Sequence, residues 1–178
     1  MKKVFFQSFP ILILCGFLEM LAGFTLCNME NFLRSLPGLI IMVPAMMNLR
    51  GAINGALVSR LGSGVHMGVI NFNERGEMRE NLKAVLLLSV ILPALIAAFA
   101  HIFCIAIGFE SIGIPKLIFI SVAVGLLSGA VLSLLSILIT YLAFKRGIDP
   151  DNVTSPLLAT FGDVLTISFL FLFAMVIA

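Results

Sequence analysis

Five long apolar stretches dominate this chain of 178 residues and decide what it can fold into. A helix needs roughly 20 consecutive apolar residues to cross the ~30 Å hydrocarbon layer of a membrane. We place the five stretches at residues 6–27, 36–61, 82–107, 114–144 and 155–177. Because they are continuously apolar rather than alternating, they favour helices over β-barrel strands. The sequence therefore predicts an all-α integral membrane protein, a bundle of five transmembrane helices.

The overall composition agrees with this class. Hydrophobic residues make up 61% of the chain and charged residues only 11%, where a soluble domain has about 25% charged residues. The net charge is +2, and no basic cluster is large enough to predict nucleic-acid binding. We expect a multi-pass protein of the cell membrane, with the lipid bilayer as its surroundings and no nucleic-acid partner.

Lysine and arginine residues predict the orientation in the membrane, because cytoplasmic segments carry most of them. With the N-terminus inside, eight basic residues are cytoplasmic (Lys2, Lys3, Arg60, Arg75, Arg79, Lys83, Lys145, Arg146) and two are outside (Arg34, Lys116). Five spans then place the C-terminus outside. Few residues precede the first span, so we expect residues 1–178 to form one membrane domain without a soluble regulatory domain.

Asp163 lies inside the last apolar stretch. A charged residue near the middle of a span costs at least about 2.5–3.5 kcal/mol, so it must face the bundle interior, a partner charge or a water-filled path. We therefore treat Asp163 as a candidate ion ligand.

The second stretch does not have the pattern of a plain span. Pro44 removes a helical hydrogen bond, and Gly51 and Gly55 loosen the turns that follow the polar residues Asn48 and Arg50. Interrupted backbone at membrane depth is tolerated where it is buried or lines a cavity, and its freed carbonyls are oxygen ligands for cations. A proline-kinked structural helix is the alternative.

The polar positions of these two stretches fall at a similar depth. At 1.5 Å per residue, Gly51 lies roughly 20 Å along the second span and Asp163 roughly 13 Å along the fifth, from opposite faces. Both are then in the middle zone of the bilayer, where a cation path needs oxygen ligands.

Two sequence motifs resemble a known family. Residues 43–62 read VPAMMNLRGAINGALVSRLG and resemble the first signature of the MgtE-type magnesium transporters and their eukaryotic solute-carrier relatives, approximately V-P-A-L-L-G-L-K-G-N-L-x-x-x-L-A-S-R-L-S. Residues 151–166 read DNVTSPLLATFGDVLT and are similar to the second, D-N-x-x-x-P-x-x-x-S-x-G-D-x-x-T. The resemblance covers essentially the whole chain. It implies a transporter or channel for divalent cations, above all Mg²⁺, and not an enzyme.

The resemblance also implies roles for individual residues. Asp163 matches the pore aspartate of the family, and Gly51 matches the glycine whose backbone contributes to the ion site. Ala52 stands where the family has Asn, and Asn48 stands where Gly is usual. An amide oxygen is thus lost at one position and gained a helical turn earlier. We expect metal ligands at Asp163, Gly51 and Asn48, with a lining or supporting group of Arg50, Ala52, Asn54, Pro44, Thr160, Thr166 and Glu19.

Three members of this supporting group have open interpretations. Glu19, in the first stretch, is either a second cation contact, a partner of Arg50, or an acid held in a structural ion pair or hydrogen bond. Thr160 and Thr166 lie three residues on either side of Asp163, hence on roughly the same helix face. They either orient the carboxylate or line the path, or they bond back to helix carbonyls.

The expected ion and assembly follow from the same resemblance. Mg²⁺ keeps several waters and binds through one or two carboxylates, and no Cys/His cluster favours zinc or copper. The eukaryotic relatives fuse two such domains, so five spans imply half of a two-fold pore. The partner is a second copy, or a different five-span chain that retains the Asn absent at Ala52.

Two alternatives belong to other classes of protein. The loss of the family Asn at Ala52 would suit a non-transporting structural subunit of a membrane complex. A membrane hydrolase would use Ser63 as nucleophile with His66 or His101 as base, but no acid is placed to orient either histidine.

In the fourth stretch, Gly125 and Gly129 predict close packing against another helix, which the sequence does not identify.

Overall fold

The computed structural model describes residues 2–67, 75–147 and 150–177, which form six helices and no strand. Five helices are long and apolar enough to cross a membrane: α1 (Lys2–Asn28), α3 (Leu39–His66), α4 (Arg75–Ile107), α5 (Ile114–Lys145) and α6 (Pro150–Ile177). The sixth, α2 (Glu30–Ser35), is a short helix that the sequence did not predict. The predicted all-α architecture with five transmembrane helices is confirmed.

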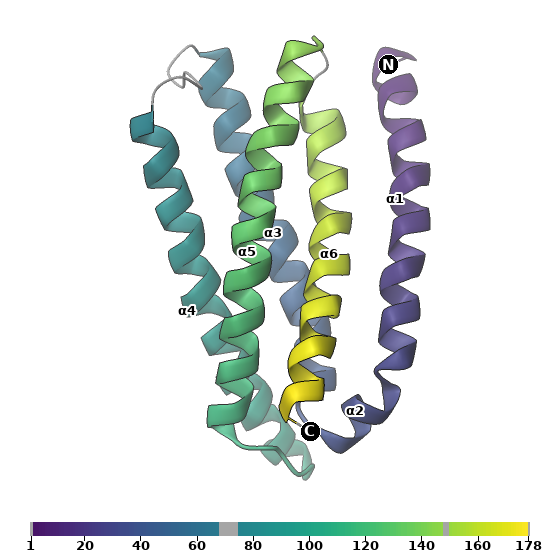
Figure 1. The fold of residues 1–178 in the computed structure, drawn as a ribbon, viewed down its shortest axis with the longest axis vertical. Coiled ribbons are helices and arrows are strands. Elements are labelled where there is room, and N and C mark those ends of the chain that lie inside the picture. Colours follow the sequence, from purple (N-terminus) through teal and green to yellow (C-terminus); the bar gives the residue numbers. More distant parts are fainter. Residues whose placement is uncertain (1, 68–74, 148–149, 178) are drawn as a thin grey trace.

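The long helices stand side by side, and α2 crosses one end of the bundle between α1 and α3 (Figure 1). The N- and C-termini lie at opposite ends, as an odd number of spans requires. Helix α6 packs against α1, α3 and α5, and α5 also packs against α4 and α3. Helix α1 rests mainly on α6, so most of its surface faces outward.

The outward surface is apolar, as a hydrocarbon environment demands. On α1 the side chains of Phe6, Phe17 and Phe24 are 73%, 66% and 69% exposed. A soluble protein rarely exposes a contiguous apolar surface of this kind. The buried core lies instead between α3, α5 and α6, where Met42, Ile120 and Leu170 are among the fully buried side chains.

The backbone between α2 and α3 depends on a glycine. Gly38 has a φ of +102°, a region that residues with a Cβ rarely adopt. A Cβ at this position would also lie 3.2 Å from the side chain of Leu117 and 3.7 Å from Sγ of Cys104. Gly38 therefore lets the chain turn directly against the ends of α4 and α5.

Helix α3 is continuous from Leu39 to His66, with Pro44 inside it. The expectation of interrupted backbone in this span is therefore wrong, and the proline-containing helix is the observed alternative. Pro44 occurs in the second turn and is exposed, so its ring displaces no neighbouring helix. Pro44 leaves one carbonyl of this helix without an amide donor, and the backbone near Gly51 is helical.

Candidate cation site

Arg50 on α3 is fully buried in the middle of the bundle. Its Nη1 donates a hydrogen bond to Oγ of Ser89 on α4 at 3.1 Å and another to the carbonyl oxygen of Gly125 on α5 at 3.0 Å. Nε and Nη2 have no hydrogen-bond partner within the described residues. Hydrogen bonds to a charged group contribute about 1.5–3 kcal/mol each, so this guanidinium ties α3 to both α4 and α5.

Two glycines of α5 make room for this arrangement. A Cβ on Gly129 would lie 2.9 Å from Nη1 of Arg50 and would clash with Oγ of Ser89. A Cβ on Gly125 would clash with the carbonyl of Ser89 and lie 2.7 Å from the ring of Pro93. The predicted close packing at these glycines is confirmed, and the neighbour is α4 of the same chain.

One of the alternatives for Glu19, a pairing with Arg50, is wrong. Arg50 bonds to Ser89 and Gly125, and in the described part of the chain no carboxylate lies within salt-bridge distance of it. The physical reason is direction: the guanidinium extends from α3 toward α4 and α5, whereas α1, which carries Glu19, packs on α6. Arg50 is therefore a tie inside the bundle rather than a charge on its surface.

Asp163 on α6 is partly buried, and it follows a glycine that α3 contacts. A Cβ on Gly162 would lie 3.3 Å from the Cβ of Arg50. This contact places the turn of α6 that bears Asp163 level with Arg50 and Gly51, in agreement with the depths derived from the sequence. Glu19 lies on α1, which packs against α6. The two acids of the apolar spans, Glu19 and Asp163, are therefore on neighbouring helices.

One face of α3 is not covered by the chain's own helices. Pro44, Asn48 and Ala52 follow each other at four-residue spacing, and all three are exposed. A Cβ on Gly51 would meet no atom within 4 Å. An amide such as that of Asn48 is costly to leave unpaired in hydrocarbon, so this face needs water or a protein partner.

The remaining supporting residues are buried. Nδ2 of Asn54 donates to the carbonyl of Arg50 at 2.9 Å, while its Oδ1 has no partner. Thr160 and Thr166 are buried on α6, and the Thr166 hydroxyl has no partner in the described structure. Their part in an ion path stays a prediction, as do the ligand roles of Asp163, Gly51 and Asn48.

Within the described residues, no three His, Cys, Asp or Glu side chains converge on a metal-sized site. A cation here would be held by carboxylates together with amide or backbone oxygens and its own water. The histidine chemistry of the hydrolase alternative also fails for His101. This residue lies near the end of α4, whereas Ser63 lies near the end of α3, and the two consecutive spans run in opposite directions. Nδ1 of His101 is 2.7 Å from Oγ of Ser111.

Ser89 is a hydrogen-bond partner of Arg50 that the sequence did not predict. Its only signal is a hydroxyl in an otherwise apolar stretch of α4. Serines in membrane helices commonly bond to carbonyls of their own helix, as Ser128, Ser133 and Ser136 do here. Nothing in the sequence separates Ser89 from these, and only the packing of α3 on α4 shows its role.

Comparison with known proteins identifies relatives over most of the chain. The model of the MgtE family, described as a divalent cation transporter, matches residues 43–173. The chain is 30% identical over 169 residues to solute carrier family 41 member 3 of Rattus norvegicus, covering 92% of this chain and 36% of that protein. It is 27% identical over 166 residues to solute carrier family 41 member 2 of Xenopus laevis, covering 89% and 29%.

The chain therefore spans about a third of the length of these curated relatives. The matched region includes the Asn48–Ala52 segment of α3 and Asp163 of α6, which hold the candidate ion ligands. The family resemblance drawn from the two motifs is thus confirmed. With its five membrane-spanning helices, this multi-pass integral membrane protein belongs to the MgtE family of divalent cation transporters.

Proposed function

We propose that this chain moves divalent cations, above all Mg²⁺, across a membrane through a site between α3 and α6. The observation that carries the proposal is Asp163, a partly buried carboxylate on α6, level with Arg50 and Gly51 through the contact at Gly162. An acid is retained in such a place when it has a function, because its burial in a span is costly. Membership of a divalent cation transporter family supports the same assignment.

The chemistry of Mg²⁺ suits this composition of side chains. Mg²⁺ dehydrates reluctantly, keeps several waters and binds through one or two carboxylates. Asp163 is the inner ligand in this proposal, and Asn48 and the backbone near Gly51 contact the ion or its waters. Glu19, on the neighbouring helix α1, acts as the second acid in this proposal. Uptake of Mg²⁺ by vesicles that contain the purified chain tests the proposal.

The proposal includes a two-fold dimer. The exposed face of α3 formed by Pro44, Asn48 and Ala52 brings small and polar groups to the surface of a single chain. A second chain related by a two-fold axis would present the same face, so that the two polar faces enclose a common path. The partner is either a second copy or a different five-span chain with Asn at the position of Ala52.

We expect the transporting species to have the mass of two chains. The purified chain in mild detergent is measured by light scattering or native mass spectrometry, and the same sample is reconstituted for uptake assays. Uptake by strictly monomeric protein would refute the two-fold arrangement. A monomer that gains uptake only when a second five-span chain is added would identify the heterodimer.

A bulkier residue at Gly51 tests the ion path without disturbing the fold of the single chain. Gly51→Val should leave the thermal stability of the single chain nearly unchanged, because no atom of the chain lies within 4 Å of the added Cβ. Uptake should fall at least about tenfold, because the added methyl groups narrow the proposed path, and passage of an ion depends on pore diameter. Uptake that equals the wild type would remove this face of α3 from the path.

The structural-subunit alternative rests on one observation, the Ala at position 52. It predicts that the chain forms complexes but moves no ions alone or with copies of itself. Wild-type vesicles with no Mg²⁺ uptake, from protein that remains folded and oligomeric, would favour this alternative over transport.

A further inference from the structure

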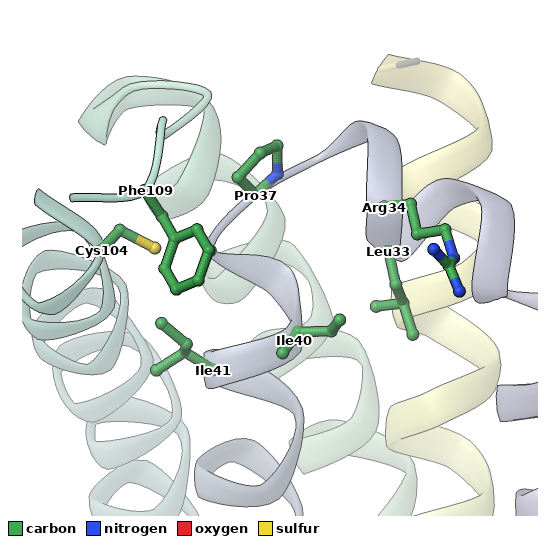
Figure 2. Close-up of a pocket in the computed structure, with 8 residues that line it drawn as sticks. Leu33, Arg34, Pro37, Ile40, Ile41, Cys104 and Phe109 are labelled. Atoms are coloured by element: carbon green, nitrogen blue, oxygen red, sulfur yellow. The ribbon is translucent and has the colours of Figure 1, made fainter. Parts of the chain in front are cut away.

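Two adjoining hollows open at the end of the bundle where α2 crosses it. The first, of about 250 Å³, lies between the α2–α3 connection and the outer turns of α4. Figure 2 shows its labelled walls, with Cys104 and Phe109 on one side, Leu33 on the other, and Ile40 and Ile41 between them. Apart from Arg34, every side chain that lines this hollow is apolar or a cysteine.

The second hollow, of about 550 Å³, lies between the last turns of α1 and α2. It includes Gly23, Leu26 and Cys27 of α1, and it shares Leu33, Arg34 and Ile40 with the first hollow. These three shared residues therefore form a ridge with one apolar hollow on each side. This division matches a molecule with two apolar chains joined at a polar group.

The polar group of the ridge is a pair of opposite charges. Nη2 of Arg34 lies 2.8 Å from Oε1 of Glu30, and Nε donates to the same oxygen at 3.1 Å. Both side chains are largely exposed, and Glu30 lines the second hollow. A guanidinium pairs well with a phosphate, and a carboxylate accepts hydrogen bonds from a primary ammonium. The Arg34–Glu30 pair is therefore complementary to a headgroup that carries a phosphate and a primary ammonium.

The depth of the ridge is that of lipid headgroups. Helix α1 ends at Asn28, α3 begins at Leu39 and α4 ends at Ile107, so the apolar spans stop at this level. The sequence has no Trp, and its one Tyr, Tyr141, lies near the other end of α5. Tryptophan and tyrosine usually anchor a span at the headgroup level. Among the described residues at this end of the bundle, neither is present.

We propose that the two hollows bind one glycerophospholipid with a primary-ammonium headgroup, of the phosphatidylethanolamine type. Its phosphate contacts Arg34, its ammonium contacts Glu30, and the upper part of one acyl chain occupies each hollow. The exposed side chain of Ile40 then separates the two acyl chains. This site is independent of the ion path, because none of the proposed ion ligands lines either hollow.

Native mass spectrometry of the full chain in mild detergent tests this site. Phosphatidylethanolamine, phosphatidylcholine and phosphatidylglycerol are added in turn, and the lipid-bound fraction is measured. We expect wild-type protein to retain phosphatidylethanolamine most strongly. Arg34→Gln should weaken retention of phosphatidylethanolamine and phosphatidylglycerol about tenfold, the loss of one charge-assisted hydrogen bond. Glu30→Gln should abolish the preference for phosphatidylethanolamine over phosphatidylglycerol.

Lys116→Gln is the matched control, because Lys116 is an exposed cation at the same end of the bundle and lines neither hollow. It should retain all three lipids as the wild type does. Equal retention by wild type, Arg34→Gln and Lys116→Gln would overturn the proposal. Ile40→Trp, which fills the ridge, should lower lipid retention without changing the oligomer. If it instead disrupts a dimer and leaves lipid retention unchanged, a second copy covers the hollows and the lipid site is refuted.

Discussion

Asp163→Asn should lower Mg²⁺ uptake by reconstituted vesicles at least about tenfold, because an amide keeps the size of the side chain but loses the charge that binds a divalent cation. Asp163→Ala, which removes both side-chain oxygens, should lower it at least as far. Uptake is followed with a Mg²⁺-sensitive dye inside the vesicles, and binding is followed by calorimetry on the same protein. Both variants should remain folded, because no hydrogen bond or ion pair in the described part of the chain depends on this carboxylate.

Glu110→Gln serves as the matched control for Asp163→Asn. Glu110 is exposed in the connection between α4 and α5, so Glu110→Gln removes one negative charge at a position away from the site. Its uptake should equal that of the wild type. Unchanged uptake and unchanged affinity in both Asp163 variants would remove Asp163 from the ion path. Equal losses in the Asp163 and Glu110 variants would point to a general charge effect.

Gly125→Val should cause the largest loss of stability among the substitutions considered. Its Cβ would meet the carbonyl of Ser89 and the ring of Pro93, and neither group can move without shifting α4. The change also displaces the carbonyl that accepts a hydrogen bond from buried Arg50. Overpacking of a core costs about 1–3 kcal/mol, and a lost bond to a buried charge adds a cost of similar size. A clearly lower midpoint of thermal unfolding in detergent is expected.

Gly16→Val is the control for the same substitution in a membrane helix. No atom lies within 4 Å of a Cβ at Gly16, which faces outward from α1. Its unfolding midpoint should stay close to that of the wild type. If Gly125→Val melts at the same temperature as Gly16→Val, then α4 and α5 do not pack at the distance described. The tie between Arg50 and α5 would also be in doubt.

The candidate site could be located from the sequence but not assembled from it. Asp163 stood out because one acid in an apolar span has a high energetic cost, and the motif around Gly51 was recognisable as a string of residues. The level at which these two segments meet followed from helix rise and is supported by the contact between Gly162 and Arg50. The partner of Arg50 did not follow. Glu19 was one candidate, on the basis of its charge, whereas the hydrogen-bond partners are the neutral groups of Ser89 and Gly125.

Two features of the backbone also escaped the sequence. The short helix α2 has only six residues, too few for a periodic apolar pattern to be recognised. Pro44 and Gly51 predicted an interruption, but α3 is helical through both residues, with Pro44 exposed in its second turn. Local propensity against a helix was outweighed by the need to satisfy backbone hydrogen bonds inside a membrane.

The sequence by itself determined the five spans, because continuous apolar runs of this length are stable only as membrane helices. It also determined the family and the two polar segments that a cation path would use. Only the tertiary structure decided which helices are neighbours and which face of each is buried. These depend on the fit of small residues such as Gly125 and Gly129 against a particular partner, and that fit is a property of surfaces rather than of residue order. It buried Arg50 between α4 and α5 and left the Asn48 face of α3 open.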